Sequence, residues 1–139
     1  MLGREVVRVG LLAYEEVATP SVPTTISESI IWKYFKEEND PSTIVEGPIR
    51  LDAALRDDAI PSIPTDKIEQ GSADVLIANN IHVGNSMYQA LVTCCGASSA
   101  LLVVGGQCPI AVPSQSEPAE NLLFSIAAGV VMVLTGFDN

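Results

Sequence analysis

The chain has 139 residues, of which 47% are hydrophobic and 17% are charged. This length and balance fit a single globular domain over residues 1–139 and argue against a disordered chain. The net charge of −10 disfavours nucleic acids and anionic membranes as partners. Any phosphate site must therefore be local, built from backbone N–H groups or from a rare cation.

The cysteines and the chain start indicate a cytoplasmic protein. Three cysteines, Cys94, Cys95 and Cys108, are an odd number and two are adjacent, so we expect no disulfide framework. The single histidine, His82, cannot complete a zinc site, so we expect no metal. The first five residues are too polar for a signal peptide, and the longest apolar stretch is shorter than the roughly 20 residues that span a bilayer.

The first part of the chain predicts strands that alternate with helices. A helix from about residue 27 to residue 38 has an apolar face that includes Ile30 and Tyr34. The other expected elements are a strand over 6–13, a short strand over 43–45 that Gly47-Pro48 ends, a turn of helix within 49–55, and a surface connection over 56–71.

The central stretch, residues 74–91, concentrates polar side chains beside a buried strand. Residues 75–78 are an apolar run typical of a strand covered on both faces. We expect a polar loop over 79–86, then a helix that buries Cys94 and Cys95 as small hydrophobic side chains. Ligands of open α/β sheets bind beyond the carboxyl ends of strands, so Asn79, Asn80, His82, Asn85 and Ser86 become candidate contacts.

The last part of the chain predicts two strands and a long helix. Strands over 98–104 and 109–112 flank a Gly105-Gly106 turn, and a helix over 119–134 lacks a polar face. Either that helix is central in the fold or it docks on a partner chain, and the small core favours the partner. The alternation of elements predicts an α/β fold, a three-layer α/β/α sandwich with a mostly parallel sheet.

Four segments, in order and compatibly spaced, resemble the phosphate acetyl/butyryltransferase family. Residues 45–55, VEGPIRLDAAL, resemble its "(D/E)GP-x-x-x-DAA" segment, and residues 73–91 resemble its "ADVL…AGN…Y-K-x-L" segment. Residues 104–109 resemble its "LG-x-x-x-P" turn, and residues 114–126 its "SR-x-(D)-S-x-x-x-(R)-L-x-SI" segment. The resemblance spans residues 8–128, nearly the whole chain.

This resemblance implies a fold, an activity and partners. Members have two α/β domains in an isocitrate dehydrogenase-like fold and transfer an acyl group between coenzyme A and inorganic phosphate. Their active site lies in the cleft between the domains, and they typically dimerise through the domain that this chain resembles. The resemblance thus implies a C-terminal domain, a homodimer, acyl-CoA and phosphate as substrates, no covalently bound cofactor, and a first domain supplied separately.

The resemblance also assigns site residues. Ser114 and Gln115 fall on the catalytic "SR" pair, and the positions that would contact substrate or coenzyme A are Asn80, His82, Gly84, Asn85 and Gly105. The family's arginine is replaced by Gln115, which brings no charge to phosphate. Losing one such contact can cost on the order of 100- to 1000-fold in rate. The acidic residue expected before "AGN" is replaced by His82.

Alternative interpretations stay open at each position. Gly84, Asn85 and Ser86 would equally serve as a helix cap, Gly105-Gly106 as a tight turn, and His82 as a solvated side chain. Three hypotheses for the whole chain follow: half of a phosphate acyltransferase, a non-catalytic coenzyme A-binding or regulatory dimeric module, and a piece of a longer enzyme.

Overall fold

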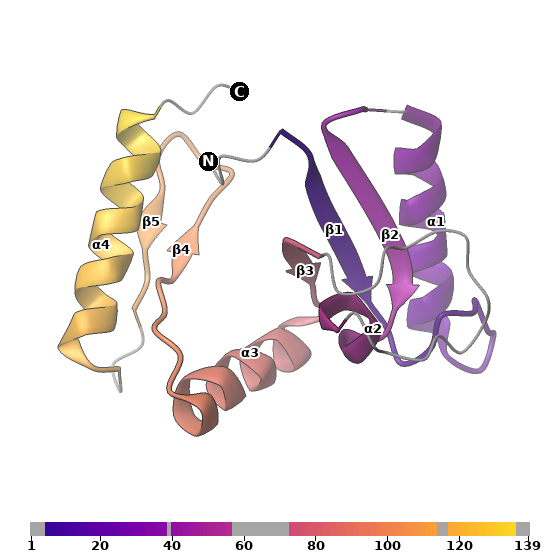
Figure 1. The fold of residues 1–139 in the computed structure, drawn as a ribbon, viewed down its shortest axis with the longest axis horizontal. Coiled ribbons are helices and arrows are strands. Elements are labelled where there is room, and N and C mark those ends of the chain that lie inside the picture. Colours follow the sequence, from indigo (N-terminus) through magenta and orange to yellow (C-terminus); the bar gives the residue numbers. More distant parts are fainter. Residues whose placement is uncertain (1–4, 39, 57–72, 114–116, 136–139) are drawn as a thin grey trace. The chain divides into compact units, whose positions relative to one another are not determined.

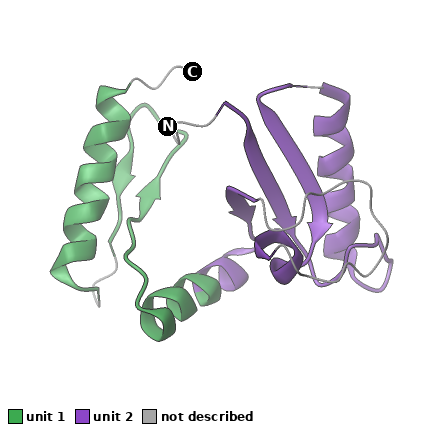
Figure 2. Ribbon diagram, viewed as in Figure 1, with its two compact units in different colours: residues 1–2, 86–139 green, residues 3–85 purple. Residues whose placement is uncertain are grey.

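The computed structural model describes residues 5–38, 40–56, 73–113 and 117–135. They form two compact units, one within residues 3–85 and the other within residues 86–139 (Figure 2). Nearly all of the connection expected over 56–71 lies outside the described residues.

The first unit is built on a parallel sheet. Its strands are β1 (Val7–Leu12), β2 (Thr43–Ile49) and β3 (Val75–Ile77), in the order β2-β1-β3 (Figure 1). Both pairings are parallel, which confirms the parallel sheet expected from the sequence. Buried apolar side chains from β1, β2 and the short helix α2 (Leu51–Leu55) form its core: Leu11, Leu12, Ile49, Ala53 and Ala54.

The prediction that Gly47-Pro48 ends the second strand is wrong, because β2 runs through both residues to Ile49. The peptide bond between them is cis. A Cβ on Gly47 would lie 2.5 Å from the Cβ of Leu11, so glycine is needed where the two strands approach closely. β2 is an edge strand in the described sheet, which is where a proline can sit without breaking the hydrogen-bonded ladder.

Helix α1 (Pro23–Glu38) begins earlier than expected, with Pro23 at its first position. The hydroxyl of Thr25 accepts a hydrogen bond from the N–H of Thr19 at 2.9 Å and donates one to the carbonyl of Val22 at 2.7 Å. Thr25 and Glu28 are its buried residues, whereas its large apolar side chains are 37–63% exposed: Ile26, Ile30, Ile31, Tyr34 and Phe35. The outward face of α1, defined by these five residues, is therefore apolar.

The second unit contains a small antiparallel ribbon and a long helix. Helix α3 (Ile81–Gln89) enters it from the first unit and continues as a π-helical turn, η1 (Ala90–Cys94). Strands β4 (Leu102–Val103) and β5 (Ile110–Ala111) pair antiparallel, apart from the parallel sheet. Helix α4 (Ala119–Leu134) has the bounds that the sequence predicts.

Polar residues of α4 are buried while most of its apolar residues are exposed. Ser125 and Asn121 are 0% and 5% exposed, and Met132 is the buried apolar residue of this helix. Large side chains that are 38–79% exposed form the outward face of α4: Leu122, Leu123, Phe124, Ile126, Val130, Val131, Val133 and Leu134. No helix in the described part of the chain has both the length and the apolar character to span a membrane.

Candidate functional site

The three parallel strands end together and define one edge of the first unit. Leu12 of β1 is paired with Ile49 of β2, and Leu11 is paired with Ile77 of β3. The segments that follow the strands therefore leave from the same carboxyl edge of the sheet. Ligands of open parallel sheets bind at this edge, so these segments are the place to look for a site.

Asn80 caps helix α3 at this edge. Its side-chain oxygen accepts a hydrogen bond from the N–H of Val83 at 3.0 Å, and its amide donates one to Asn79 at 2.8 Å. The cap explains why α3 begins at Ile81. The loop predicted over 79–86 is therefore wrong beyond Asn80, and the capping role considered for Gly84, Asn85 and Ser86 belongs to Asn80.

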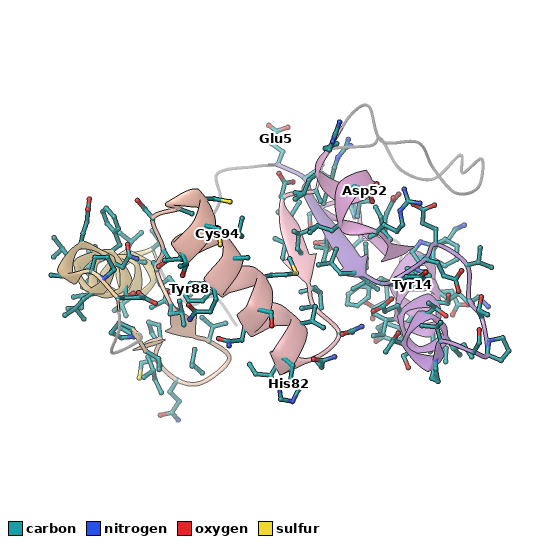
Figure 3. All side chains as sticks on the ribbon, turned by 90° about the horizontal axis from the view of Figure 1, so that it is seen from below. Glu5, Tyr14, Asp52, His82, Tyr88 and Cys94 are labelled. Atoms are coloured by element: carbon teal, nitrogen blue, oxygen red, sulfur yellow. The ribbon has the colours of Figure 1, made fainter. Side chains whose placement is uncertain are left out.

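The remaining predicted contacts on α3 lie within its helical turns. Gly84 packs against the end of β3, since a Cβ there would lie 3.4 Å from that of Ala78. His82 and Asn85 are exposed, and in Figure 3 His82 projects away from Asp52. The structure therefore places Asn80, His82, Gly84 and Asn85 on the first turns of one helix, and their contact with a ligand stays a prediction.

Gly105 and the predicted catalytic pair belong to the later part of the chain. Gly105 lies between β4 and β5 with φ of +95°, a conformation that favours glycine. This supports the tight-turn interpretation and leaves ligand contact untested. Ser114 and Gln115 lie outside the described residues.

The sequence analysis missed an ion pair that follows β2 at the carboxyl edge. Nε of Arg50 donates to Oδ1 of Asp52 at 3.0 Å, and Nη2 donates to Oδ2 at 3.0 Å. These hydrogen bonds lower the pKa of the Asp52 carboxyl and raise the pKa of the Arg50 guanidinium. The negative charge of Glu16 also raises the pKa of Arg50. No sequence signal marked this pair, because the strand was expected to end before Gly47-Pro48 and not at Ile49.

A second missed cluster lies in the unit of residues 86–139. The hydroxyl of Tyr88 donates to Oε1 of Glu117 and lies 3.1 Å from the hydroxyl oxygen of Ser99. Ser99 in turn donates to Oε2 of Glu117 at 3.4 Å. This cluster joins α3, the segment before β4, and the start of α4. Glu117 occupies the acidic position of the "SR-x-(D)" pattern, which was the signal in the sequence.

The cysteines are not core residues. Cys94, Cys95 and Cys108 are all free and exposed, so the prediction that Cys94 and Cys95 are buried is wrong. Cys94 is the last residue of the π-helical turn η1 and Cys95 follows it, and none of the residues of η1 is buried. No three His, Cys, Asp or Glu side chains of the described ranges come together as a metal site.

The fold matches that of known phosphotransacylases. The crystal structure of a branched-chain phosphotransacylase from Enterococcus faecalis superimposes with a TM-score of 0.80 at 26% identity, over 93% of this chain and 46% of that one. A phosphotransacetylase from Staphylococcus aureus shares the fold with a TM-score of 0.61 at 20% identity, over 91% of this chain and 40% of that one. These likenesses confirm the predicted fold class.

The sequence comparisons assign the family. Residues 1–130 match the family model described as phosphate acetyl/butaryl transferase. The chain is 30% identical to a probable phosphate butyryltransferase of Bacillus subtilis over 93% of this chain and 43% of that protein. It is also 30% identical to a phosphate acetyltransferase of Thermotoga maritima, over 94% of this chain and 45% of that protein. The chain belongs to the phosphate acetyl/butaryl transferase family, and it spans less than half the length of these relatives.

Proposed function

We propose that the chain acts as one half of a phosphate acyltransferase, which moves an acyl group between coenzyme A and inorganic phosphate when a complementary first domain completes it. The observation that carries the proposal is family membership over residues 1–130, in a chain that spans only 43–45% of the relatives' length.

The outward face of α4 supports completion by a further domain. Besides its exposed side chains, an apolar groove of about 320 Å³ lies along α4 and β5, lined by Ala111, Ile126 and Val130 among others. Apolar surface of this extent is stabilised when another protein surface covers it. We assign it to the complementary domain, which the relatives' additional length would supply.

In this proposal a phosphate oxygen attacks the thioester carbonyl carbon of acyl-CoA. The carbon–sulfur bond breaks, the acyl phosphate forms, and the leaving sulfur becomes the thiol of coenzyme A on protonation. Ser114 and Asn85 position the substrate, and Gln115 polarises phosphate through neutral hydrogen bonds. Asn80, His82, Gly84 and Gly105 contact coenzyme A. The three free thiols support a reducing compartment, which we take to be the cytoplasm.

The test is a direct assay of acyl phosphate formation from acyl-CoA and phosphate. The chain is assayed alone and together with the separately expressed first domain of a relative such as the Bacillus subtilis protein. We expect turnover only in the mixture. A Gln115→Arg variant should raise the rate by on the order of 100-fold if the family's charge is what the chain lacks. Absence of turnover in every mixture, including the variant, would contradict the enzymatic proposal.

A non-catalytic coenzyme A-binding module is the second candidate, and the neutral Gln115 in place of arginine favours it. Calorimetric titration with coenzyme A separates the two. Binding without acyl phosphate formation in any mixture supports the module. If the chain neither binds coenzyme A nor forms acyl phosphate in any mixture, both the acyltransferase and the binding module are ruled out.

The homodimer is also a proposal, and we place it on the outward face of α1. Exposed apolar side chains favour contact between two copies, whereas the net charge of −10 on each copy opposes it. On α1 the acidic Glu28 is buried and Ile30 and Tyr34 are exposed, with Glu38 beside Tyr34 at the end of this face. Light scattering should give a dimer mass that Ile30→Glu converts to a monomer, whereas the exposed-face control Lys33→Glu should not. A monomeric wild-type chain would refute this part.

A further inference from the structure

We infer that the outward face of α4 binds an apolar strip of the complementary domain that carries lysine or arginine side chains at its two ends. The inference rests on the proposed function, which assigns this face to that domain, and adds the chemistry by which the domain is recognised. The distribution of charge in the unit of residues 86–139 indicates that chemistry.

The sequence of residues 86–139 contains no lysine, arginine or histidine. All seven lysines and arginines of the chain lie at or before Lys67, and the single histidine is His82. The charged residues of this part of the sequence are the acidic Glu117, Glu120 and Asp138. A partner that approaches this unit therefore meets charge of one sign, which favours a cationic surface over an anionic one.

Both ends of helix α4 are negative. Glu120 is exposed in the first turn. The carboxylate of Glu117, just before the helix, is held by hydrogen bonds from Tyr88 and Ser99. The last turn of α4 carries no basic side chain, so the partial negative charge at the carboxyl end of the helix is not offset there. The 16 residues of α4 place these two ends about 24 Å apart, which sets the spacing of the cations on a matching partner.

Between these ends the outward face of α4 is apolar and hollowed. No charged residue occurs in the sequence from 121 to 137. The groove of about 320 Å³ along α4 and β5 is lined by the small residues Ala111 and Gly129 and by larger ones such as Ile126 and Val130. Apolar side chains are stabilised by burial there, whereas a charged side chain would lose its hydration without a partner. The middle of the matching strip is therefore apolar.

The same charge pattern disfavours a second copy of the chain on this face. If two α4 helices packed in parallel, the acidic start of one would lie against the acidic start of the other. If they packed antiparallel, each acidic start would lie against the negative carboxyl end of the other helix. A surface with a cation at each end avoids this repulsion, and the complementary domain is the occupant that can present one.

The first experiment uses two synthetic helical peptides that share a face of leucines and differ only in carrying either lysine or glutamate at both ends. Calorimetry with the full chain at low salt should show that the lysine peptide binds roughly 10-fold more tightly, and this preference should fade at about 1 M salt. Glu120→Gln should weaken binding of the lysine peptide by about two- to fivefold. Glu37→Gln, which removes the same charge from α1, should change it by less than about twofold.

A second pair of variants tests the apolar groove. Val130→Ser should weaken binding of the lysine peptide by roughly 5- to 10-fold, because the buried valine contact is lost. Val17→Ser makes the same change at an exposed valine of the other unit and should have no effect. Circular dichroism verifies that each variant keeps its helix content. Equal binding of the two peptides, or equal binding by the two serine variants, would overturn the inference.

Hydrogen exchange of the chain mixed with the first domain of the Bacillus subtilis relative tests the occupant. We expect slower exchange along residues 122–134 in the mixture, and less protection at about 1 M salt. If the mixture forms acyl phosphate while exchange on α4 is unchanged, the acyltransferase stands and this inference is wrong. If α4 is protected while no mixture turns over, the inference stands and the acyltransferase fails. If the domain leaves α4 unprotected, or if Val130→Ser converts a dimer of the chain to a monomer, the assigned occupant is wrong.

Discussion

The hydroxyl of Ser125, which is fully buried on α4, accepts a hydrogen bond from the backbone N–H of Leu101 at 3.0 Å. The same hydroxyl donates to the carbonyl of Asn121 at 2.9 Å, and the side chain of Asn121 accepts from the N–H of Ser99 at 3.3 Å. Helix α4 is thus attached to the segment before β4 through polar contacts.

Replacing Ser125 by alanine should destabilise the unit that contains α4. The change leaves the N–H of the half-buried Leu101 without its partner, which costs on the order of 1 kcal/mol. Hydrogen exchange detected by mass spectrometry should show faster exchange in residues 99–103 and along α4. Ser98→Ala, at an exposed serine nearby, is the control and should leave exchange unchanged. Equal exchange in both variants would contradict this role for Ser125.

The stability of the unit that contains α1 should fall as pH rises from about 4.5 to 7. Burial raises the pKa of the Glu28 carboxyl from 4.5 to about 7. The folded state therefore binds a proton in this range that the unfolded state has released, and deprotonation costs on the order of 3 kcal/mol by pH 8. Below about 4.5 both states are protonated and the penalty is absent.

Urea unfolding followed through Trp32, the single tryptophan, measures this dependence. In the Glu28→Gln variant the free energy of unfolding should hardly fall as pH rises, and the variant should be more stable than the parent at pH 8. Glu37→Gln removes a charge from the exposed side of the same helix and should keep the decline. A parent whose stability tracks that of Glu28→Gln at every pH would rule out a buried titrating carboxyl.

Replacing Gly47 by alanine should cost more than the same change at Gly10. A Cβ at Gly47 would approach the Cβ of Leu11 to 2.5 Å and its carbonyl oxygen to 3.1 Å, so β1 and β2 must move apart. A Cβ at Gly10 would meet side-chain atoms at 3.4 Å or more. We expect about 1–3 kcal/mol of destabilisation for Gly47→Ala by urea unfolding and clearly less for Gly10→Ala. The reverse order would contradict the close approach of the strands.

Removing the hydroxyl of Tyr88 should loosen the start of α4. Tyr88→Phe leaves the Glu117 carboxylate with Ser99 alone as its partner in this cluster, and loss of a hydrogen bond to a charged group costs roughly 1.5–3 kcal/mol. Hydrogen exchange at residues 117–124 should accelerate. Tyr14→Phe, at a tyrosine that is 79% exposed, serves as the control and should have no effect there.

Elements with strong periodicity were predictable from the sequence, and functional geometry was less so. The bounds of α4 followed from an unbroken apolar run after a proline. β2 was cut short because Gly47-Pro48 normally interrupts a strand, and only the contact with Leu11 explains their place within one. Such a contact joins residues far apart in the chain, which local patterns do not contain.

The same limit applies to the site. Asn80 was predicted as a ligand contact, which stays a prediction, and the structure adds that its side chain caps α3, a role that the same residue type serves. The ion pair of Arg50 and Asp52 was missed because charged residues two positions apart are common on any surface. The burial of Glu28 was not predicted either, since a helical pattern does not say which of its faces meets the sheet.

The two sides of helix α4 have different surroundings, since one is buried within its own unit and the other is exposed. Substitutions on the side that holds Asn121 and Ser125 should change how this chain folds, whether or not another protein is present. Substitutions on the outward face of α4, such as at Val130, should leave folding nearly unchanged and alter only what the chain assembles with. Variants on α4 that are found in genetic or biochemical screens can therefore be sorted by the side of the helix they affect, into those that impair folding and those that impair assembly.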